Sequence, residues 1–134
     1  ATIRGNVDRI EVDSEGSFYV IDFKTGKNEI SGEKAKSNLQ LACYQLAVVL
    51  DGFKERLGGT SSSGAELVYL AKDSVSVTTR KQPRIDPEEV QAKIEEIAIG
   101  MGASTFKATI NKMCSNCVVK SSCPIQVNGR TVIS

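Results

Sequence analysis

Two runs of alternating residues, separated by a short turn sequence, constrain the fold of this chain most strongly. Residues 2–12 (TIRGNVDRIEV) alternate between two faces, and residues 18–23 (FYVIDF) follow them after the sequence DSEGS. A period of two residues is that of a strand, and a turn sequence between two such runs favours direct pairing. The two runs therefore predict a β-hairpin over residues 2–24.

The remaining sequence predicts helices and further strands. Apolar residues recur at helical spacing from Glu33 to Leu57, which predicts one helix. Residues 65–71 and 74–79 predict two more strands, the second of them at a sheet edge.

A final helix has a well-marked start. Asp86 precedes Pro87 and two glutamates, which is the pattern of an N-cap followed by an acidic first turn, and we expect the helix to run to about Met101. The order β-β-α-β-β-α predicts an α/β fold in which helices flank a mixed sheet. We expect this core to span residues 1–104 and a tail around a cysteine cluster to span residues 105–134.

Length, charge and composition exclude several functions. The 134 residues suit one domain, and 17 Lys and Arg against 16 Asp and Glu leave no global basic field, so any nucleic acid must be held by a local patch. The absence of histidine excludes a Ser-His-Asp or Cys-His catalytic arrangement. No apolar run approaches the roughly 20 residues of a membrane helix.

The beginning of the chain and its cysteines suggest where the protein works. The sequence starts at Ala1 already in strand-like sequence, and we expect it to be a piece of a larger protein. It has no signal-peptide pattern, and four cysteines without a secretion signal favour a reducing compartment, so we expect a cytoplasmic location.

An acid and a lysine interrupt the second run of the hairpin. Residues i and i+2 of a strand share a face, so Asp22 and Lys24 are expected to project together while Phe23 points into the core. Asp8 lies in the partner run. Two carboxylates held close together repel, and a hard cation such as Mg²⁺ or Mn²⁺ relieves that repulsion. Two acids, a metal and a lysine are the minimum equipment for metal-assisted phosphodiester hydrolysis.

Taken alone, the same residues have simpler interpretations. An arbitrary D-x-K sequence is more often a partly exposed ion pair, worth at most about 1 kcal/mol. Residues 24–27 (KTGK) also resemble the end of a phosphate-binding loop, but the earlier glycine of G-x-x-x-x-G-K is missing, and we reject that interpretation.

Three motifs together change this balance, because they resemble the RecB-like branch of the PD-(D/E)xK nucleases. The motifs G-x-x-D-R, D-x-K-T-G and Q-x-x-x-Y occur in this order and are carried by Gly5, Asp8, Arg9, Asp22, Lys24, Thr25, Gly26, Gln40 and Tyr44. The resemblance covers most of the chain and implies a restriction-endonuclease-like core.

The resemblance also implies roles for individual residues. It implies that the catalytic residues are Asp8, Asp22, Lys24, Gln40 and Tyr44. Asp8 and Asp22 would bind Mg²⁺ or Mn²⁺ together with the backbone carbonyl of Phe23, and Lys24 would assist the chemistry. Family members carry a helix before the first motif, with a His or Glu that completes the metal site, and that helix is expected to precede this chain.

The third motif and the arginine of the first are less specific. Gln40 and Tyr44 lie four residues apart on one predicted helix face, so both can line the same cleft. Taken in isolation, they would be better explained by ordinary helix packing. Arg9 lies on the face opposite Asp8 and is expected to anchor the scaffold or to contact phosphate.

The tail contains a second candidate site. Cys114, Cys117 and Cys123 form C-x2-C-x5-C, a spacing typical of metal ligands, although free or oxidised thiols are the alternative. Nucleases of the AddB and AdnB type end in a similar pattern, which together with an upstream cysteine holds a [4Fe-4S] cluster. The resemblance implies this cluster in the intact parent protein and its absence here, since the upstream cysteine is missing. Cys43 is interpreted as a buried small hydrophobe.

These features predict a DNA-cleaving hydrolase that serves DNA repair or recombination. We expect an exonuclease, rather than an endonuclease, that acts with a helicase motor on single-stranded DNA. Candidates for contact with the DNA backbone are Lys27, Lys34, Lys36, Arg80, Lys81 and Arg84. The alternative is a nuclease-fold module that has lost catalysis and serves DNA binding or scaffolding, and a zinc-binding interaction domain ranks last.

Overall fold

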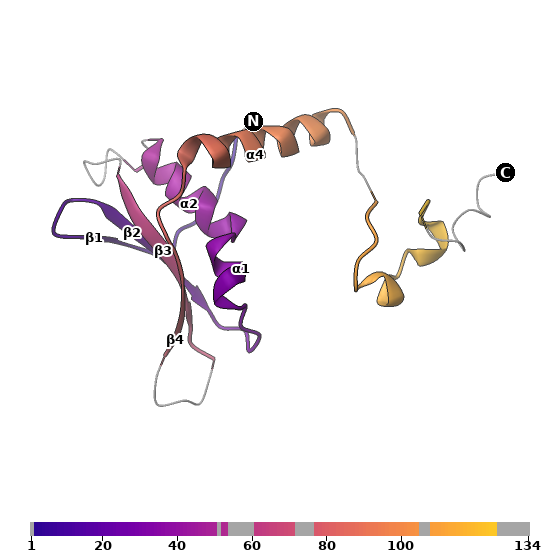
Figure 1. Cartoon of the computed structure of the whole chain (residues 1–134), viewed down its shortest axis with the longest axis horizontal. Helices are drawn as coiled ribbons and strands as arrows, with labels where there is room; N and C mark the ends of the chain where they lie inside the picture. Colours follow the sequence, from indigo (N-terminus) through magenta and orange to yellow (C-terminus); the bar gives the residue numbers. More distant parts are fainter. Residues whose placement is uncertain (1, 51, 54–60, 72–76, 105–107, 126–134) are drawn as a thin grey trace. The chain divides into compact units, whose positions relative to one another are not determined.

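Four strands form one mixed sheet in the order β1-β2-β3-β4 (Figure 1). In this computed structural model the strands are β1 (Arg9–Val12), β2 (Phe18–Lys24), β3 (Ser62–Tyr69) and β4 (Thr78–Gln82). The outer pairs are antiparallel and the central pair, β2 with β3, is parallel. The predicted fold class is thereby confirmed, and β4 is an edge strand among the described strands.

The structure describes residues 2–50, 52–53, 61–71, 77–104 and 108–125. The chain divides into two units, residues 1–96 and 97–134. The first unit contains the sheet. The described part of the second unit contains the end of helix α4 and two short 3-10 helices, Cys114–Asn116 and Lys120–Ser122. The predicted boundary after residue 104 stays a prediction.

The predicted hairpin forms, but its first strand is much shorter than predicted. Only Arg9–Val12 pairs with β2. The Asp8 carboxylate accepts a hydrogen bond from the backbone N–H of Phe23 at 2.8 Å, and this bond replaces further backbone pairing between the two strands. At the other end, the Asp13 carboxylate accepts hydrogen bonds from the backbone of Ser17 and Glu15 at 2.8 and 3.0 Å. These bonds, chiefly the one from Ser17, lower the pKa of Asp13 and close the turn.

The single helix predicted from Glu33 to Leu57 is wrong, because the chain breaks into α1 (Gly32–Lys36) and α2 (Leu39–Val49). Asn38 starts the second helix, since its side chain accepts a hydrogen bond from the backbone N–H of Leu41 at 3.0 Å. Residue 51 and residues 54–57 of the predicted helix lie outside the described residues.

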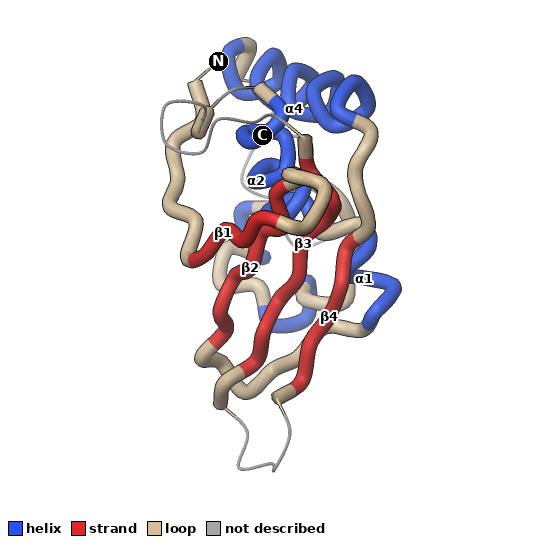
Figure 2. Tube along the Cα trace, turned by 90° about the vertical axis from the view of Figure 1, so that its left-hand side faces the viewer, coloured by secondary structure: helices blue, strands red, loops and turns tan. Residues whose placement is uncertain are grey.

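Helices α1 and α2 cover one face of the sheet (Figures 1 and 2). Between them and the sheet lies the buried core, formed by Phe18, Val20, Leu41, Val48, Ala65, Leu67 and Tyr69. Because alternate residues of β2 share a face, Asp22 follows Val20 onto this covered face and is only 4% exposed. The expectation that Phe23 points into the core is therefore wrong, and its side chain is 37% exposed on the other face.

Helix α4 begins in the first unit, as predicted. Helix α4 spans Pro87–Gly102, and the Asp86 carboxylate accepts hydrogen bonds from the backbone of Glu88 and Glu89 at 2.9 and 3.3 Å. The N-cap prediction at Asp86 is thereby confirmed. Within the described ranges, no helix has the length and apolar character needed to cross a membrane.

A glycine fixes the course of β3 beside the strand that carries Asp22. The pairing of β2 with β3 skips Ser63, so Gly64 lies at a bulge opposite Tyr19. Gly64 has a φ of +139°, and a Cβ atom at this position would lie 2.9 Å from the carbonyl oxygen of Gln82. Both the backbone conformation and the close approach require glycine.

Gly64→Ala is expected to lower the free energy of unfolding by about 3 kcal/mol, because it adds backbone strain to a collision with the neighbouring strand. Urea denaturation of the purified protein measures this change. Gly26→Ala is the matched control, because no atom lies within 4 Å of a Cβ there, and its effect should stay near 0.5 kcal/mol or below. Equal unfolding midpoints for the two variants would contradict the described bulge.

Candidate active site

Asp22 is a nearly buried carboxylate near the end of β2. Its Oδ1 accepts a hydrogen bond from Nε2 of Gln40 at 3.1 Å, and its Oδ2 lies 2.7 Å from Nζ of Lys24. In the described part of the chain, Oδ2 accepts no well-aligned hydrogen bond, so the ammonium is its ion-pair partner only. A carboxylate in such a place is stable only beside a cation.

Gln40 links the acid, the lysine and the tyrosine of the predicted site. Its Oε1 accepts a hydrogen bond from Lys24 Nζ at 2.9 Å, and its Nε2 donates to Asp22 and also to the Tyr44 hydroxyl at 2.9 Å. These partners use both amide hydrogens, and a reversed amide would place its oxygen against the carboxylate. The amide orientation is therefore fixed, and four of the predicted residues form one bonded group, which we call the site cluster (Asp22, Lys24, Gln40 and Tyr44).

The local sequence explains why the helix presents these two side chains together. Gln40 and Tyr44 are one turn apart on α2, while Leu41 and Val48 on another face of the helix enter the core. Gly5 lies beside the tyrosine, since a Cβ atom there would be 3.8 Å from the Tyr44 ring. The glycine of the first predicted motif thus lies against the tyrosine of the third.

Asp8 and the Phe23 backbone lie next to the site cluster. Asp8 immediately precedes β1, and continuing the register of Arg9 with Ile21 by one residue places Asp8 opposite Asp22. The N–H of Phe23 points to this side, as its bond with Asp8 shows, and in a strand the N–H and C=O of one residue point the same way. The Phe23 carbonyl therefore points to the β1 side of β2, beyond the end of β1.

This set of oxygen atoms fits a hard divalent cation. The described residues contain no group of three or more Asp, Glu, Cys or His side chains that could hold a metal. Among them, the candidate ligands at this place are the Asp8 and Asp22 carboxylates and the Phe23 carbonyl. Mg²⁺ commonly takes only one or two carboxylates and completes its shell with waters and substrate phosphates. The buried Oδ2 of Asp22, which lacks an aligned donor, is a suitable ligand atom.

The family of the chain follows from the sequence of residues 1–124, which matches the PD-(D/E)XK nuclease superfamily. The chain belongs to this superfamily. Its four-stranded mixed sheet and flanking helices agree with the restriction-endonuclease-like fold of PD-(D/E)XK nucleases. Nucleases of this superfamily typically use Mg²⁺ or Mn²⁺.

Other comparisons add little to this assignment. No curated protein matches the chain. A solved structure described as "Crystal structure of SSO0001" is similar over 90% of this chain and 50% of its own, with 21% sequence identity and a TM-score of 0.40. This chain thus spans about half the length of that protein, and a similarity of this strength carries no weight beside the superfamily match.

Two arginines singled out by the sequence make contacts within the protein. Arg9 lies 2.6 Å from Glu11 in an exposed ion pair on the face of β1 away from Asp8. Arg80 binds the Glu29 carboxylate at 2.9 Å and donates to the Ile30 carbonyl at 3.0 Å. Arg80 therefore holds the connection that leads from β2 to α1.

The cysteines are all free thiols. In the described part of the second unit, Cys114, Cys117 and Cys123 do not form a metal-binding group, and the iron–sulfur cluster of the intact parent stays a prediction. Cys43 is half-buried on α2, and burial raises the pKa of its thiol. A protonated thiol suits the interpretation of Cys43 as a small packing residue.

Sequence reasoning missed a group of buried polar residues on α2, β3 and β4. Gln45, Ser62 and Gln82 are fully or almost fully buried and bonded to one another. Gln45 could have been found, because it lies between Leu41 and Val48 on the helix stripe that otherwise enters the core. Gln82 lies at a strand end before Pro83, and its sequence context gives no comparable signal.

Proposed function

We propose that this chain is the nuclease domain of a RecB-like DNA repair or recombination enzyme, and that it cleaves DNA with Mg²⁺ or Mn²⁺. The site cluster carries the proposal, because it joins the D-x-K and Q-x-x-x-Y motifs by direct bonds. Asp8, Asp22 and the Phe23 carbonyl are the proposed metal ligands. Superfamily membership supports the same chemistry.

The side chains of this site have distinct tasks in the proposed reaction. The bound metal supplies Lewis-acid activation of the phosphate and of a water molecule. Lys24 places a positive charge beside Asp22, where charge develops on the phosphate oxygens. Gln40 holds the lysine head group through its Oε1, and the Tyr44 hydroxyl, which accepts a bond from Gln40, can donate its own proton to a phosphate oxygen.

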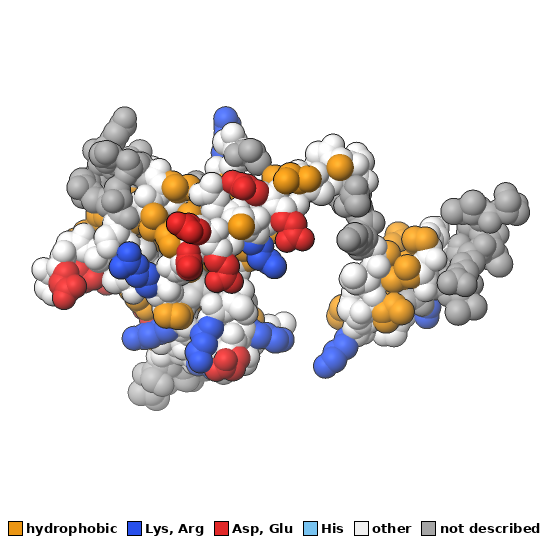
Figure 3. All heavy atoms as spheres, turned by 45° about the horizontal axis from the view of Figure 1, so that its top comes forward, with side chains coloured by type: hydrophobic (Ala, Val, Ile, Leu, Met, Phe, Trp, Pro, Cys, Tyr) orange, Lys and Arg blue, Asp and Glu red, His pale blue; other side chains and the backbone are white. Residues whose placement is uncertain are grey.

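The wider role that we propose is that of an exonuclease fed with single-stranded DNA by a helicase motor. Lys and Arg side chains lie among Asp and Glu side chains on the face of the first unit that Figure 3 shows. With a net charge of +1, the chain provides little general attraction for DNA, and delivery by a motor offsets this weakness. In the intact parent, of the AddB or AdnB type, we propose that the C-terminal cysteines hold a [4Fe-4S] cluster.

Metal removal tests the proposed function in the full-length protein. We expect Mn²⁺ or Mg²⁺ to support cleavage of end-labelled single-stranded DNA, and EDTA to reduce it to background, because the phosphate loses its Lewis acid. Product lengths from 5′- and 3′-labelled strands distinguish an exonuclease from an endonuclease. Absence of cleavage, together with no heat of Mn²⁺ binding in calorimetry, would instead identify a nuclease-fold scaffold.

A further inference from the structure

A network of buried amides links β4 to the junction between α1 and α2. Gln82 is 2% exposed, and its Nε2 lies 3.2, 3.1 and 3.0 Å from the carbonyl oxygens of Ala35, Lys36 and Asn38. We call these three contacts the Gln82 clamp. They reach two carbonyls at the end of α1 and that of Asn38, the residue that caps α2. The Ala35 and Asn38 carbonyls also accept backbone hydrogen bonds, from Asn38 and Ala42 at 3.1 Å each.

The orientation of the Gln82 amide is fixed by its surroundings. Two amide hydrogens serve three carbonyl oxygens, and the Gln82 Oε1 accepts a hydrogen bond from Nε2 of Gln45 at 3.0 Å. A reversed amide would place its oxygen against the three carbonyls. The Gln45 side chain has no hydrogen-bonding capacity left. Besides its bond to Gln82, it donates to the Pro83 carbonyl and accepts from the Ser62 hydroxyl and the backbone N–H of Ile85.

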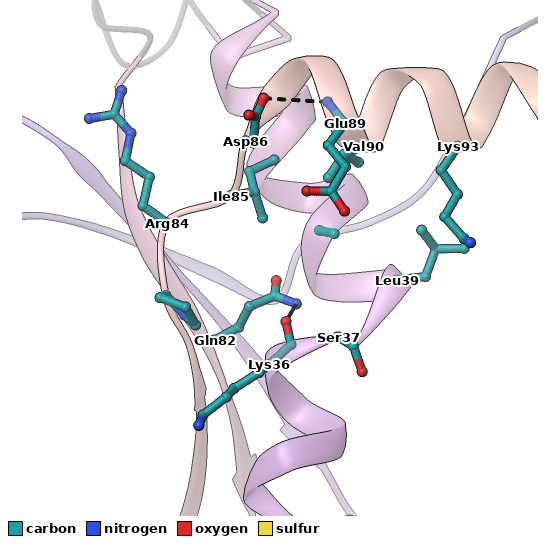
Figure 4. Close-up of a pocket in the computed structure, with 12 residues that line it drawn as sticks. Lys36, Ser37, Leu39, Gln82, Arg84, Ile85, Asp86, Glu89, Val90 and Lys93 are labelled. Atoms are coloured by element: carbon teal, nitrogen blue, oxygen red, sulfur yellow. Dashed lines mark hydrogen bonds between the residues drawn. The ribbon is translucent and has the colours of Figure 1, made fainter.

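The clamp lies at the start of α2. Gln82 extends from the end of β4 to the α1–α2 junction, beside Lys36 and Ser37 (Figure 4). Asn38 is both held by the clamp and the N-cap of α2, and Gln40 follows two residues later. A shift of this junction therefore moves the Gln40 amide relative to Asp22 and Lys24.

We assign no ligand to the pocket beside the clamp. It has a volume of about 460 Å³, and Leu39 and Ala42 line it on a different face of α2 from Gln40. Figure 4 shows that the charged ends of its Lys36, Glu89 and Lys93 side chains do not converge on one point. Because Gln82 lines this pocket, a different side chain at position 82 has room to fit. The main effect of such a substitution should therefore be the loss of the amide hydrogen bonds, and not a steric clash.

We propose that Gln82 is a positioning residue of the candidate active site, acting through the α1–α2 junction on Gln40. Gln82 does not touch the site cluster, and it sets the start of the helix that carries the Gln40 amide. This inference rests on the proposed nuclease function for its kinetic consequence, while its structural consequence is independent of activity.

Gln82→Met removes the clamp while keeping an unbranched side chain of similar length. We expect kcat for DNA cleavage to fall about 10- to 100-fold with little change in KM, because a displacement of about 1 Å in a positioned group costs about that much. Ser62→Ala is the matched control, because it removes the bond to Gln45 in the same buried network, and one from the Gly64 backbone, without touching the junction. Its kcat should stay within about twofold. If Gln82→Met does not fold, Gln82→Asn retains the amide on a side chain one methylene shorter and takes its place.

A double-variant cycle separates positioning from general destabilisation. If Gln82 acts through Gln40, adding Gln82→Met to Gln40→Ala lowers kcat by no more than about twofold further. A further loss of 10- to 100-fold in the double variant would overturn the inference, because the two residues would then act independently.

Nuclear magnetic resonance tests whether Gln82 positions the Gln40 amide, and this test does not require an active enzyme. The Gln40 side-chain amide, assigned by its disappearance in Gln40→Ala, should have a bonded chemical shift in wild type and in Ser62→Ala. In Gln82→Met it should move towards that of a free glutamine side chain. An unchanged signal in Gln82→Met would overturn the inference, whereas an inactive wild type with the expected shift would refute only the proposed nuclease function.

Discussion

Replacing Asp22 with asparagine is expected to reduce metal-dependent DNA cleavage about a thousandfold or more and to leave the fold intact. The amide has nearly the shape of the carboxylate and retains an oxygen that can accept the Gln40 bond. It lacks the negative charge that holds a divalent cation, and losing about 4 kcal/mol of transition-state stabilisation corresponds to about a thousandfold in rate. Single-turnover cleavage and circular dichroism of the same protein preparation measure both effects.

Glu11→Gln is the control for this substitution. Glu11 lies on the other face of the same hairpin, where its exposed ion pair with Arg9 is worth no more than about 1 kcal/mol. Its cleavage rate should equal that of wild type. If Asp22→Asn cleaves DNA at a rate within about tenfold of wild type, the Asp22 carboxylate is not required for the reaction.

Lys24→Met is expected to impair both activity and stability. The substitution leaves the nearly buried Asp22 carboxylate without its cation, and since the lysine side chain is 33% exposed, solvent moderates the cost. We expect the free energy of unfolding to fall by about 2 kcal/mol and the cleavage rate to fall at least about a hundredfold. Urea denaturation and the cleavage assay used for Asp22→Asn measure the two losses.

Combining Lys24→Met with Asp22→Asn separates the two losses. The neutral pair should recover most of the lost stability, because no unpaired charge remains in the site, while cleavage should stay at background. Lys27→Met is the matched control, since Lys27 is exposed and should change the unfolding midpoint little. If the double variant is as unstable as Lys24→Met alone, the ion pair does not account for the stability loss.

Local signals in the sequence were enough to predict several elements of this fold. The hairpin follows from two alternating runs around a turn, and the start of α4 follows from Asp86 ahead of Pro87. Both depend on bonds between residues close in sequence, which residue type alone largely determines. The spacing of Gln40 and Tyr44 likewise predicted that they share a helix face, and their direct bond agrees with this.

Other features depend on partners far away in sequence and were therefore missed. The break between α1 and α2 is stabilised by Gln82, which comes more than forty residues later. Phe23 was expected in the core because it is apolar, but the helices pack on the face shared by Val20 and Asp22. Which face of a strand is covered depends on where the helices pack, and the alternating pattern of β2 alone does not specify this.

The spacing of these contacts along the chain has a consequence for protein synthesis. Asp8, Asp22, Lys24 and Gln40 contact partners at most 18 residues away in sequence, whereas the Gln82 clamp spans more than forty. During translation, every side chain of the site cluster emerges from the ribosome well before Gln82. A nascent chain therefore holds the proposed reacting groups before it has β4. Under the proposed role of Gln82, the candidate site is aligned only once the sheet is complete.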